Sequence, residues 1–207
     1  MARSEDEDSE QYMPTKRLET LVDGIFAIAM TLLVLGLAVP HINEPLSNMV
    51  VQNSFYTLLP NLFSFVLSFI LLALFWNRHH RIFSEIKTIN STLIWINVVW
   101  LLFIVLVPFS SSALGQYGSY TLPNVIFNLN MLGIAIFLSL TRYYAGRKNL
   151  MQEVSPSQIK FTKITSVGFI SIALLALLLS YTLPNPSYST TVYVLIIPLH
   201  AVRRINH

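Results

Sequence analysis

The chain has 207 residues, of which 54% are hydrophobic and 11% are charged, whereas about a quarter of the residues of an average soluble domain are charged. The net charge is +3, but the basic residues are scattered through short segments beside apolar runs, so we exclude nucleic acid as a partner. The chain has no cysteine, which excludes disulfides, thiolate metal sites and a cysteine nucleophile.

The composition predicts an all-α integral membrane protein, embedded in the lipid bilayer and without a soluble domain. Residues 1–15 form an acidic N-terminal tail, which carries Glu5, Asp6, Glu7, Asp8 and Glu10 and is expected to be disordered. Residues 16–207 are expected to form one transmembrane domain. The first apolar run does not have the pattern of a signal peptide, because an acidic segment precedes it and no small-residue cleavage site follows.

Apolar runs of about twenty residues, the length needed to cross roughly 30 Å of hydrocarbon, predict six transmembrane helices. The predicted spans are 18–39, 54–76, 91–108, 122–144, 162–183 and 189–202. The last is short, so we expect it to be tilted, shielded by its neighbours or only partly embedded. All thirteen basic residues then fall on one side, since segments 40–53, 109–121 and 184–188 contain none. The positive-inside rule therefore places both termini in the cytoplasm.

Asp23 lies at the entrance of the first span, where an ionised carboxylate is costly unless it is paired or hydrated. On a helix that turns 100° per residue, Asp23 points about 140° away from Ile28. One stripe about 100° wide contains Gly24, Ile28, Thr31, Leu32, Leu35 and Val39. If that stripe faces a pore, Asp23 faces neighbouring helices and fastens the helix to one of them. The alternative is a favourable interaction with the helix dipole alone, of about 0.3–1 kcal/mol.

Motifs of the common enzyme classes are missing, so the sequence predicts neither an enzyme nor a cofactor site. There is no phosphate-binding glycine loop, no His-Glu-x-x-His pair and no Gly-x-Ser-x-Gly elbow. His79 and His80 are adjacent and would point about 100° apart on a helix, so they do not form a metal-binding pair. The stretch GQYGSY at residues 115–120 is expected to be an outer loop and lacks the order of a TVGYG potassium filter.

Polar residues inside the predicted spans are hydroxyls and amides, and we expect them to form hydrogen bonds between helices. They are Ser64, Ser68, Asn97, Asn128, Asn130 and Ser171. Coupled transporters usually carry acidic or histidine residues at mid-depth, and the chain has almost none there. This weighs against a transporter without excluding it.

Two segments together resemble a known family. Arg17-x-x-x-Leu21-Val22-Asp23 followed by GIFAIAMTLLVL resembles the first span of the bacterial relatives of transmembrane protein 175, the endolysosomal potassium channel. FWNRHHRIF, residues 75–83, resembles the end of the second span in that family. The family signature is Arg-x-x-x-Phe-Ser-Asp, so Leu21 and Val22 depart from it, and the hydrogen bond of the serine is missing here.

The resemblance implies a potassium-selective channel in the bacterial inner (cell) membrane, with K+ as the permeant ion and no cofactor. It implies a homotetramer in which the first spans line the pore and a hydrophobic constriction replaces a carbonyl filter. Ile28 would form the narrowest ring of this hydrophobic gate, and Leu32 and Leu35 further layers. Thr31 would face the pore near the constriction and favour potassium over sodium.

The resemblance also implies a structural network that packs the first span against the second and third. Its members would be Arg17, Asp23, Trp76, His79 and His80. If either histidine pairs with Asp23, a pH near 6.5 is expected to tune gating. The simpler alternatives are that Trp76 is an interfacial aromatic and that the histidines are exposed loop residues.

Each pore residue also has a simpler interpretation, namely ordinary packing or contact with lipid. For the whole chain, the alternative functions are a secondary transporter for a small cation or solute, and a membrane scaffold without transport.

Overall fold

The computed structural model describes residues 15–42, 45, 47–152 and 156–196, and this part of the chain is built from helices and short connections. The helices, in chain order, are α1 (Thr15–Leu32), the 3-10 helix η1 (Leu33–Gly36), α2 (Asn48–Tyr56), α3 (Leu59–Ser84), α4 (Ser91–Tyr117), α5 (Thr121–Arg147), α6 (Pro156–Thr182) and the 3-10 helix η2 (Pro186–Leu195). Within the described residues, five helical stretches are long and apolar enough to cross a membrane: α1 continued by η1, α3, α4, α5 and α6.

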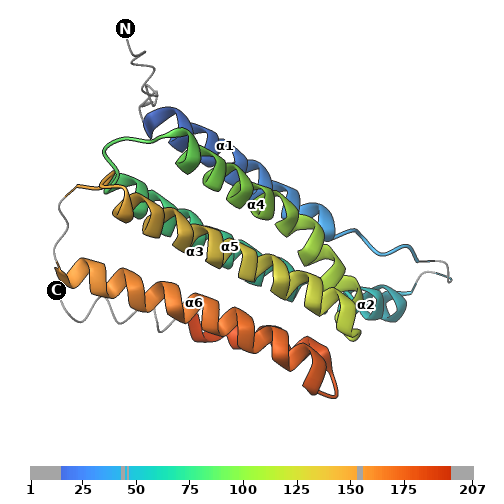
Figure 1. The fold of residues 1–207 in the computed structure, drawn as a ribbon. Coiled ribbons are helices and arrows are strands. Elements are labelled where there is room, and N and C mark those ends of the chain that lie inside the picture. Colours follow the sequence, from blue (N-terminus) through green and yellow to red (C-terminus); the bar gives the residue numbers. More distant parts are fainter. Residues whose placement is uncertain (1–14, 43–44, 46, 153–155, 197–207) are drawn as a thin grey trace, which may run out of the picture.

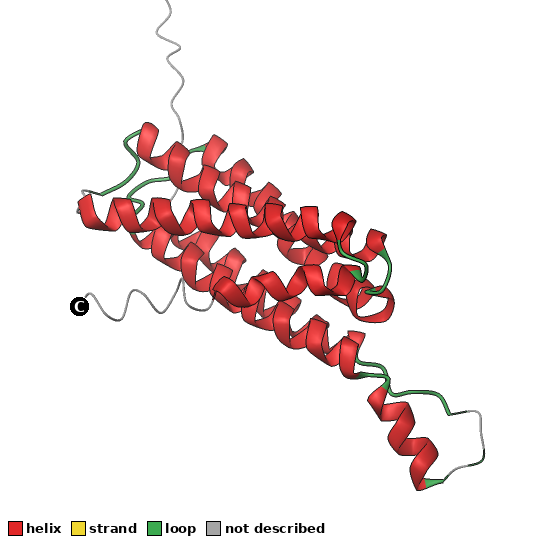
Figure 2. Cartoon of the chain, turned by 90° about the horizontal axis from the view of Figure 1, so that it is seen from below, coloured by secondary structure: helices red, strands yellow, loops and turns green. Residues whose placement is uncertain are grey.

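The long helices lie side by side, with α4 in contact with α1, α3 and α5, and α6 in contact with α5 and η2 (Figure 1). The short helix α2 stands beyond one end of this bundle (Figure 2). At the opposite end, α1 and α6 begin and α3 and α5 finish. We call this the basic end, because the basic residues of the described part of the chain lie in or next to these helix ends.

Two loops at the basic end are joined to each other. Ile86 and Met151 form an antiparallel bridge, and Arg142 makes an ion pair and hydrogen bond with Glu85. The backbone N–H groups of Lys87 and Gln152 donate to carbonyls of the facing loop, at 2.8 and 2.7 Å. The connection α3–α4 and the described part of the connection α5–α6, residues 148–152, are therefore joined by paired backbone groups.

Several of the predicted helix boundaries were wrong, and the ends of α3 and α4 were wrong for a shared reason. The expected outer loop 109–121 is mostly helix, since α4 runs to Tyr117 and so includes the first three residues of GQYGSY. Likewise, α3 begins later than predicted and continues past Trp76 to Ser84. Polar residues that lower the hydropathy of these segments are packed inside the protein: Ser111 donates to the Ser64 carbonyl at 3.1 Å and accepts from Ser68 at 2.8 Å.

The structure describes only residues 189–196 of the predicted sixth transmembrane helix, 189–202. Its described part belongs to η2, a 3-10 helix that ends at Leu195, and residues 197–202 lie outside the described residues. Of the acidic tail, 1–15, only Thr15 is described. The described residues thus establish an all-helical protein with five apolar spans.

Candidate pore-lining helix

Helix α1 has two distinct faces. Leu18, Val22, Phe26, Ala29 and Leu33 are buried and pack toward α4 and α3. Phe26 lies against Trp100 of α4, with ring centroids 5.5 Å apart. These apolar contacts attach one face of the helix to its own subunit.

The other face of α1 is uncovered in the single chain. We call its exposed residues the outward row: Gly24, Ile28, Thr31, Leu32 and, in η1, Leu35. The exposed fractions of Ile28 and Leu35 are 60% and 73%. A methyl group added at Gly24 would meet no atom within 4 Å. The row is therefore free to contact lipid, water or another copy of the chain.

Thr31 supplies a polar atom within the outward row. Its Oγ1 donates a hydrogen bond of 2.8 Å to the backbone carbonyl of Ile28, on the same helix. Because the hydroxyl proton is used inside the helix, the oxygen lone pairs remain available to a water molecule or a cation.

The C-terminal end of α1 tightens into the 3-10 turn η1, where the Gly36 carbonyl accepts from Asn61 Nδ2 at 3.4 Å. A Cβ at Gly36 would lie 3.5 Å from Ser112. The helix is therefore close to α3 and α4 at the point where the chain leaves the bundle.

Asp23 is held to α3 by one hydrogen bond within the described residues. Trp76 Nε1 on α3 donates to Asp23 Oδ1 at 2.8 Å, and the ring of His80 stacks on Trp76 with centroids 6.2 Å apart. The carboxylate is thus paired at the basic end of α1, on a different side of the helix from Ile28.

His79 belongs to a separate buried cluster. Its Nε2 lies 3.1 Å from Asn97 Oδ1, and its ring is stacked between Phe83 and Trp100, at 4.1 and 4.6 Å. Because Asn97 Nδ2 donates to the Leu93 carbonyl at 2.8 Å, the amide oxygen faces the histidine, and Nε2 carries the proton in this network. The hydrogen bond and the stacking join α3 to α4.

The five residues of the expected network are therefore divided. Asp23, Trp76 and His80 form one chain of contacts, and His79 lies in another cluster. Arg17 is exposed, and no hydrogen bond or ion pair connects it to another described residue. Neither histidine hydrogen-bonds to Asp23 within the described part of the chain, so the condition for pH tuning through such a pair is not met there.

Sequence reasoning predicted that Asn97 hydrogen-bonds between helices but did not identify its partner, and it missed the role of Trp100. Asn97 holds His79, and Trp100 connects that histidine to Phe26 of α1. Trp100 gave no signal, because an aromatic residue in a membrane helix is equally suited to contact with lipid.

The polar residues of the spans mostly form the expected hydrogen bonds between helices. The confirmed pairs are Ser68 with Ser111, Asn97 with His79, Asn128 with Ser180, and Asn130 with Ser110. Among the residues that the structure describes, no group of three or more His, Asp or Glu side chains is arranged to hold a metal ion.

Comparison with known proteins gives consistent matches. Residues 17–108 match the family model of the endosomal/lysosomal potassium channel TMEM175. Over 124 residues the chain is 29% identical to a potassium channel of Chryseobacterium sp., and this alignment covers 60% of this chain and 61% of that protein. Over 103 residues it is 35% identical to a potassium channel of Chamaesiphon minutus, and this alignment covers 50% of each protein. The matched segments thus span half to about three-fifths of these curated relatives.

The fold also matches a solved structure over nearly its whole length. The crystal structure of a lysosomal potassium-selective channel TMEM175 homolog from Chamaesiphon minutus aligns with a TM-score of 0.74 and 26% sequence identity. The alignment covers 93% of this chain and 98% of that chain. The likeness therefore extends beyond α4, where the match to the family model ends.

Proposed function

We propose that this chain, which belongs to the TMEM175 family, is a subunit of a potassium-selective channel of the bacterial cell membrane. The family is one of potassium channels, which are not enzymes. The observation that carries the proposal is the outward row of α1, which is apolar except for Thr31, exposed and on the side away from the subunit's own core.

Four copies are proposed to meet around a central axis through their α1 helices. Gly24, Ala27 and Thr31 are small and exposed, and they follow one another at intervals of three and four residues. Small residues let helices approach closely within a membrane. Packing of this kind would bring the outward rows of the four copies to a common axis.

Ile28, Leu32 and Leu35 are then proposed as layers of a hydrophobic constriction, with Ile28 as its narrowest ring. A ring of aliphatic side chains closes a pore by excluding water, and a small rotation or tilt of each helix would widen and wet it. Thr31, whose oxygen keeps its lone pairs, would replace part of the hydration shell of a potassium ion. This is weaker than a carbonyl filter, so we expect moderate selectivity over sodium.

The contacts of α1 support a helix whose basic end is fixed and whose remaining length is able to move. Trp76 holds Asp23 at the basic end of α1, and we place this end in the cytoplasm on the positive-inside rule. The remainder of α1 is held by apolar contacts, and a longer hydrogen bond, from Asn61 to the Gly36 carbonyl, lies beyond its far end in η1. We further propose that 189–202 is a sixth, short membrane span, as the sequence predicts, which would place both termini in the cytoplasm.

The experiment is to reconstitute the purified chain in a planar bilayer with a potassium gradient. A channel gives unitary current steps and a reversal potential that follows the gradient, and the mass of the detergent-solubilised complex should equal four chains. Replacing Thr31 by valine, which has a similar shape, should lower the preference for potassium over sodium. Transport of a solute against its gradient would instead establish a secondary transporter, and the absence of both currents and transport would contradict the proposal.

A further inference from the structure

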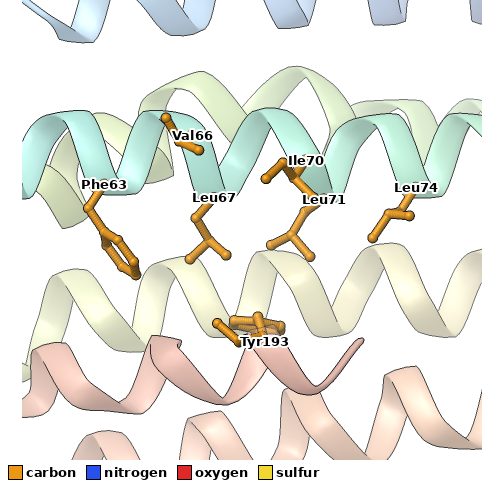
Figure 3. A pocket seen from close by; sticks show the side chains of 8 residues that line it. Phe63, Val66, Leu67, Ile70, Leu71, Leu74 and Tyr193 are labelled. Atoms are coloured by element: carbon orange, nitrogen blue, oxygen red, sulfur yellow. The ribbon is translucent and has the colours of Figure 1, made fainter. Parts of the chain in front are cut away.

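A shallow apolar groove lies between α3 and η2, on a different side of α3 from the contact with α1. It has a volume of about 120 Å³. Its floor is made by Leu67, Leu71 and Tyr193, which are buried, and its rim by Val66, Ile70 and Val194, which are exposed. Figure 3 shows Leu67 and Leu71 pointing from α3 toward the helix that carries Tyr193.

A buried cation, Arg78, lies one turn beyond Leu74, the last residue of α3 that lines the groove. At 100° per residue, Leu67, Leu71, Leu74 and Arg78 fall within a stripe about 60° wide on one face of α3. Arg78 is only 7% exposed. From Leu67 to Arg78 the helix rises about 17 Å, close to the roughly 15 Å of hydrocarbon in one leaflet of a bilayer.

Arg78 bridges α3 to α6 through neutral groups. Its Nη2 donates to the Thr162 carbonyl at 3.0 Å and to Ser166 Oγ at 2.7 Å. Its guanidinium carbon lies 5.4 Å from the centre of the Phe169 ring. Both hydrogen bonds use Nη2, so three N–H donors on Nε and Nη1 have no acceptor among the described residues.

No described carboxylate neutralises this charge. Glu85 is paired with Arg142, and Arg142 repels Arg78 because both are cations. Lys160 and Lys163, near the start of α6, are exposed at the same end of the bundle. A buried guanidinium with neutral partners favours an anionic ligand, and its planar fork of donors suits a phosphate.

We propose that the groove holds one acyl chain of an anionic phospholipid whose phosphate binds Arg78. Apolar packing against Leu67, Leu71 and Tyr193 would hold the acyl chain, and the charge of Arg78 would give the preference for an anionic headgroup. Arg78 and the groove are connected along one helix face, so a single lipid satisfies both. This inference goes beyond the proposed channel function and does not depend on it.

The test is native mass spectrometry of the full-length protein, solubilised after reconstitution with equal amounts of phosphatidylglycerol and phosphatidylcholine. The wild-type protein should retain one phosphatidylglycerol per subunit in preference to phosphatidylcholine. Arg78→Gln should weaken phosphatidylglycerol binding about tenfold, the effect of losing a charge-assisted hydrogen bond. Arg78→Lys should retain part of the preference, and Lys87→Gln, which removes an exposed charge at the same end, should retain all of it.

A second variant tests the groove without touching Arg78. Val66→Trp adds bulk at the exposed rim, where it need not disturb folding, and should displace the lipid. Equal retention of the two lipids by the wild-type protein, or unchanged phosphatidylglycerol binding in Arg78→Gln, would overturn the proposal. Loss of subunit assembly in Val66→Trp with no change in bound lipid would identify the groove as a contact between copies, which also overturns it.

Discussion

Helix α1 and the 3-10 helix η2 lie on opposite sides of the subunit (Figure 1) and are held by different interactions. Tyr193 of η2 donates to Asn128 Oδ1 at 2.9 Å, and Asn128 Nδ2 donates to Ser180 and Ser189 at 2.8 and 3.4 Å. All four side chains are buried. Within the described residues, by contrast, α1 and its continuation η1 make two side-chain hydrogen bonds to other helices: the one between Asp23 and Trp76, and a longer one of 3.4 Å from Asn61 to the Gly36 carbonyl.

This difference separates a fixed element from one that is able to move. Several directional hydrogen bonds in a buried cluster allow one geometry, since any displacement leaves polar groups without partners. Apolar side chains contribute to stability through contact area, which changes little on a small rotation or tilt. Between the hydrogen bonds near its two ends the span is held by apolar contacts alone, and such a stretch is suited to gating.

The largest expected effect follows from breaking the polar cluster. Asn128→Leu removes the shared partner of three hydroxyl groups and leaves Tyr193 buried without its acceptor, so we expect a loss of about 2–3 kcal/mol of stability. Thermal unfolding of the detergent-solubilised protein measures this loss.

Asn130→Leu is the matched control, because Asn130 is also a buried amide on α5 but its side chain makes one hydrogen bond to the described residues, of 3.2 Å, to Ser110. We expect it to cost about 1 kcal/mol. Equal losses in the two variants would contradict the view that the cluster is the stronger attachment.

The second effect concerns the outward row. Ile28→Ser should raise the potassium current about tenfold, which corresponds to a barrier lower by about 1.4 kcal/mol, because a polar side chain keeps the constriction wet. Selectivity over sodium should fall at the same time. Val105→Ser is the control, since Val105 is similarly exposed but lies on α4, and its current should remain at the wild-type level.

The third effect concerns the anchor of α1. Trp76→Phe keeps an aromatic ring but removes the hydrogen bond to Asp23, a loss of about 1 kcal/mol. We expect this to change the ratio of open to closed times about fivefold while the unitary conductance stays the same. Trp95→Phe alters an exposed tryptophan of α4 and should leave gating unchanged. A changed conductance in Trp76→Phe would show that this residue acts on the permeation path itself.

The smallest effect is expected for His80. His80→Gln removes the stacking on Trp76 but leaves the hydrogen bond to Asp23, so open probability should change less than about twofold, or about 0.4 kcal/mol. An effect as large as that of Trp76→Phe would mean that the histidine, and not the tryptophan alone, holds the anchor in place.

The five long apolar helices were predictable because hydrocarbon demands about twenty apolar residues per crossing. The helix ends were not, because hydropathy treats Arg78, His79 and Ser111 as exposed, whereas each is buried beside a partner. The helix type of the predicted sixth span also could not be derived from its length. Its residues Tyr193 and Ser189 are held by hydrogen bonds to Asn128, which lies far away in the sequence.

For the candidate site, the sequence predicted that Asp23 points away from the stripe of Ile28, which follows from helix geometry alone. The sequence did not decide whether Trp76, His79 or His80 contacts Asp23. That choice depends on how α3 is rotated relative to α1, which the sequence does not give. Arg78 was missed for the same reason. Its neighbours on α6 lie more than eighty positions later in the chain.

The central claim is that the outward row of α1 lines a pore, and cysteine accessibility tests it most directly. Because the chain has no cysteine, single variants Ile28→Cys, Leu32→Cys and Leu35→Cys can each be exposed to a water-soluble thiol reagent during current recording. The account predicts that modification at these positions blocks the current, whereas modification of Val105→Cys on α4 has no effect. Unaltered currents at all three positions of the row, with block at Val105→Cys, would contradict it.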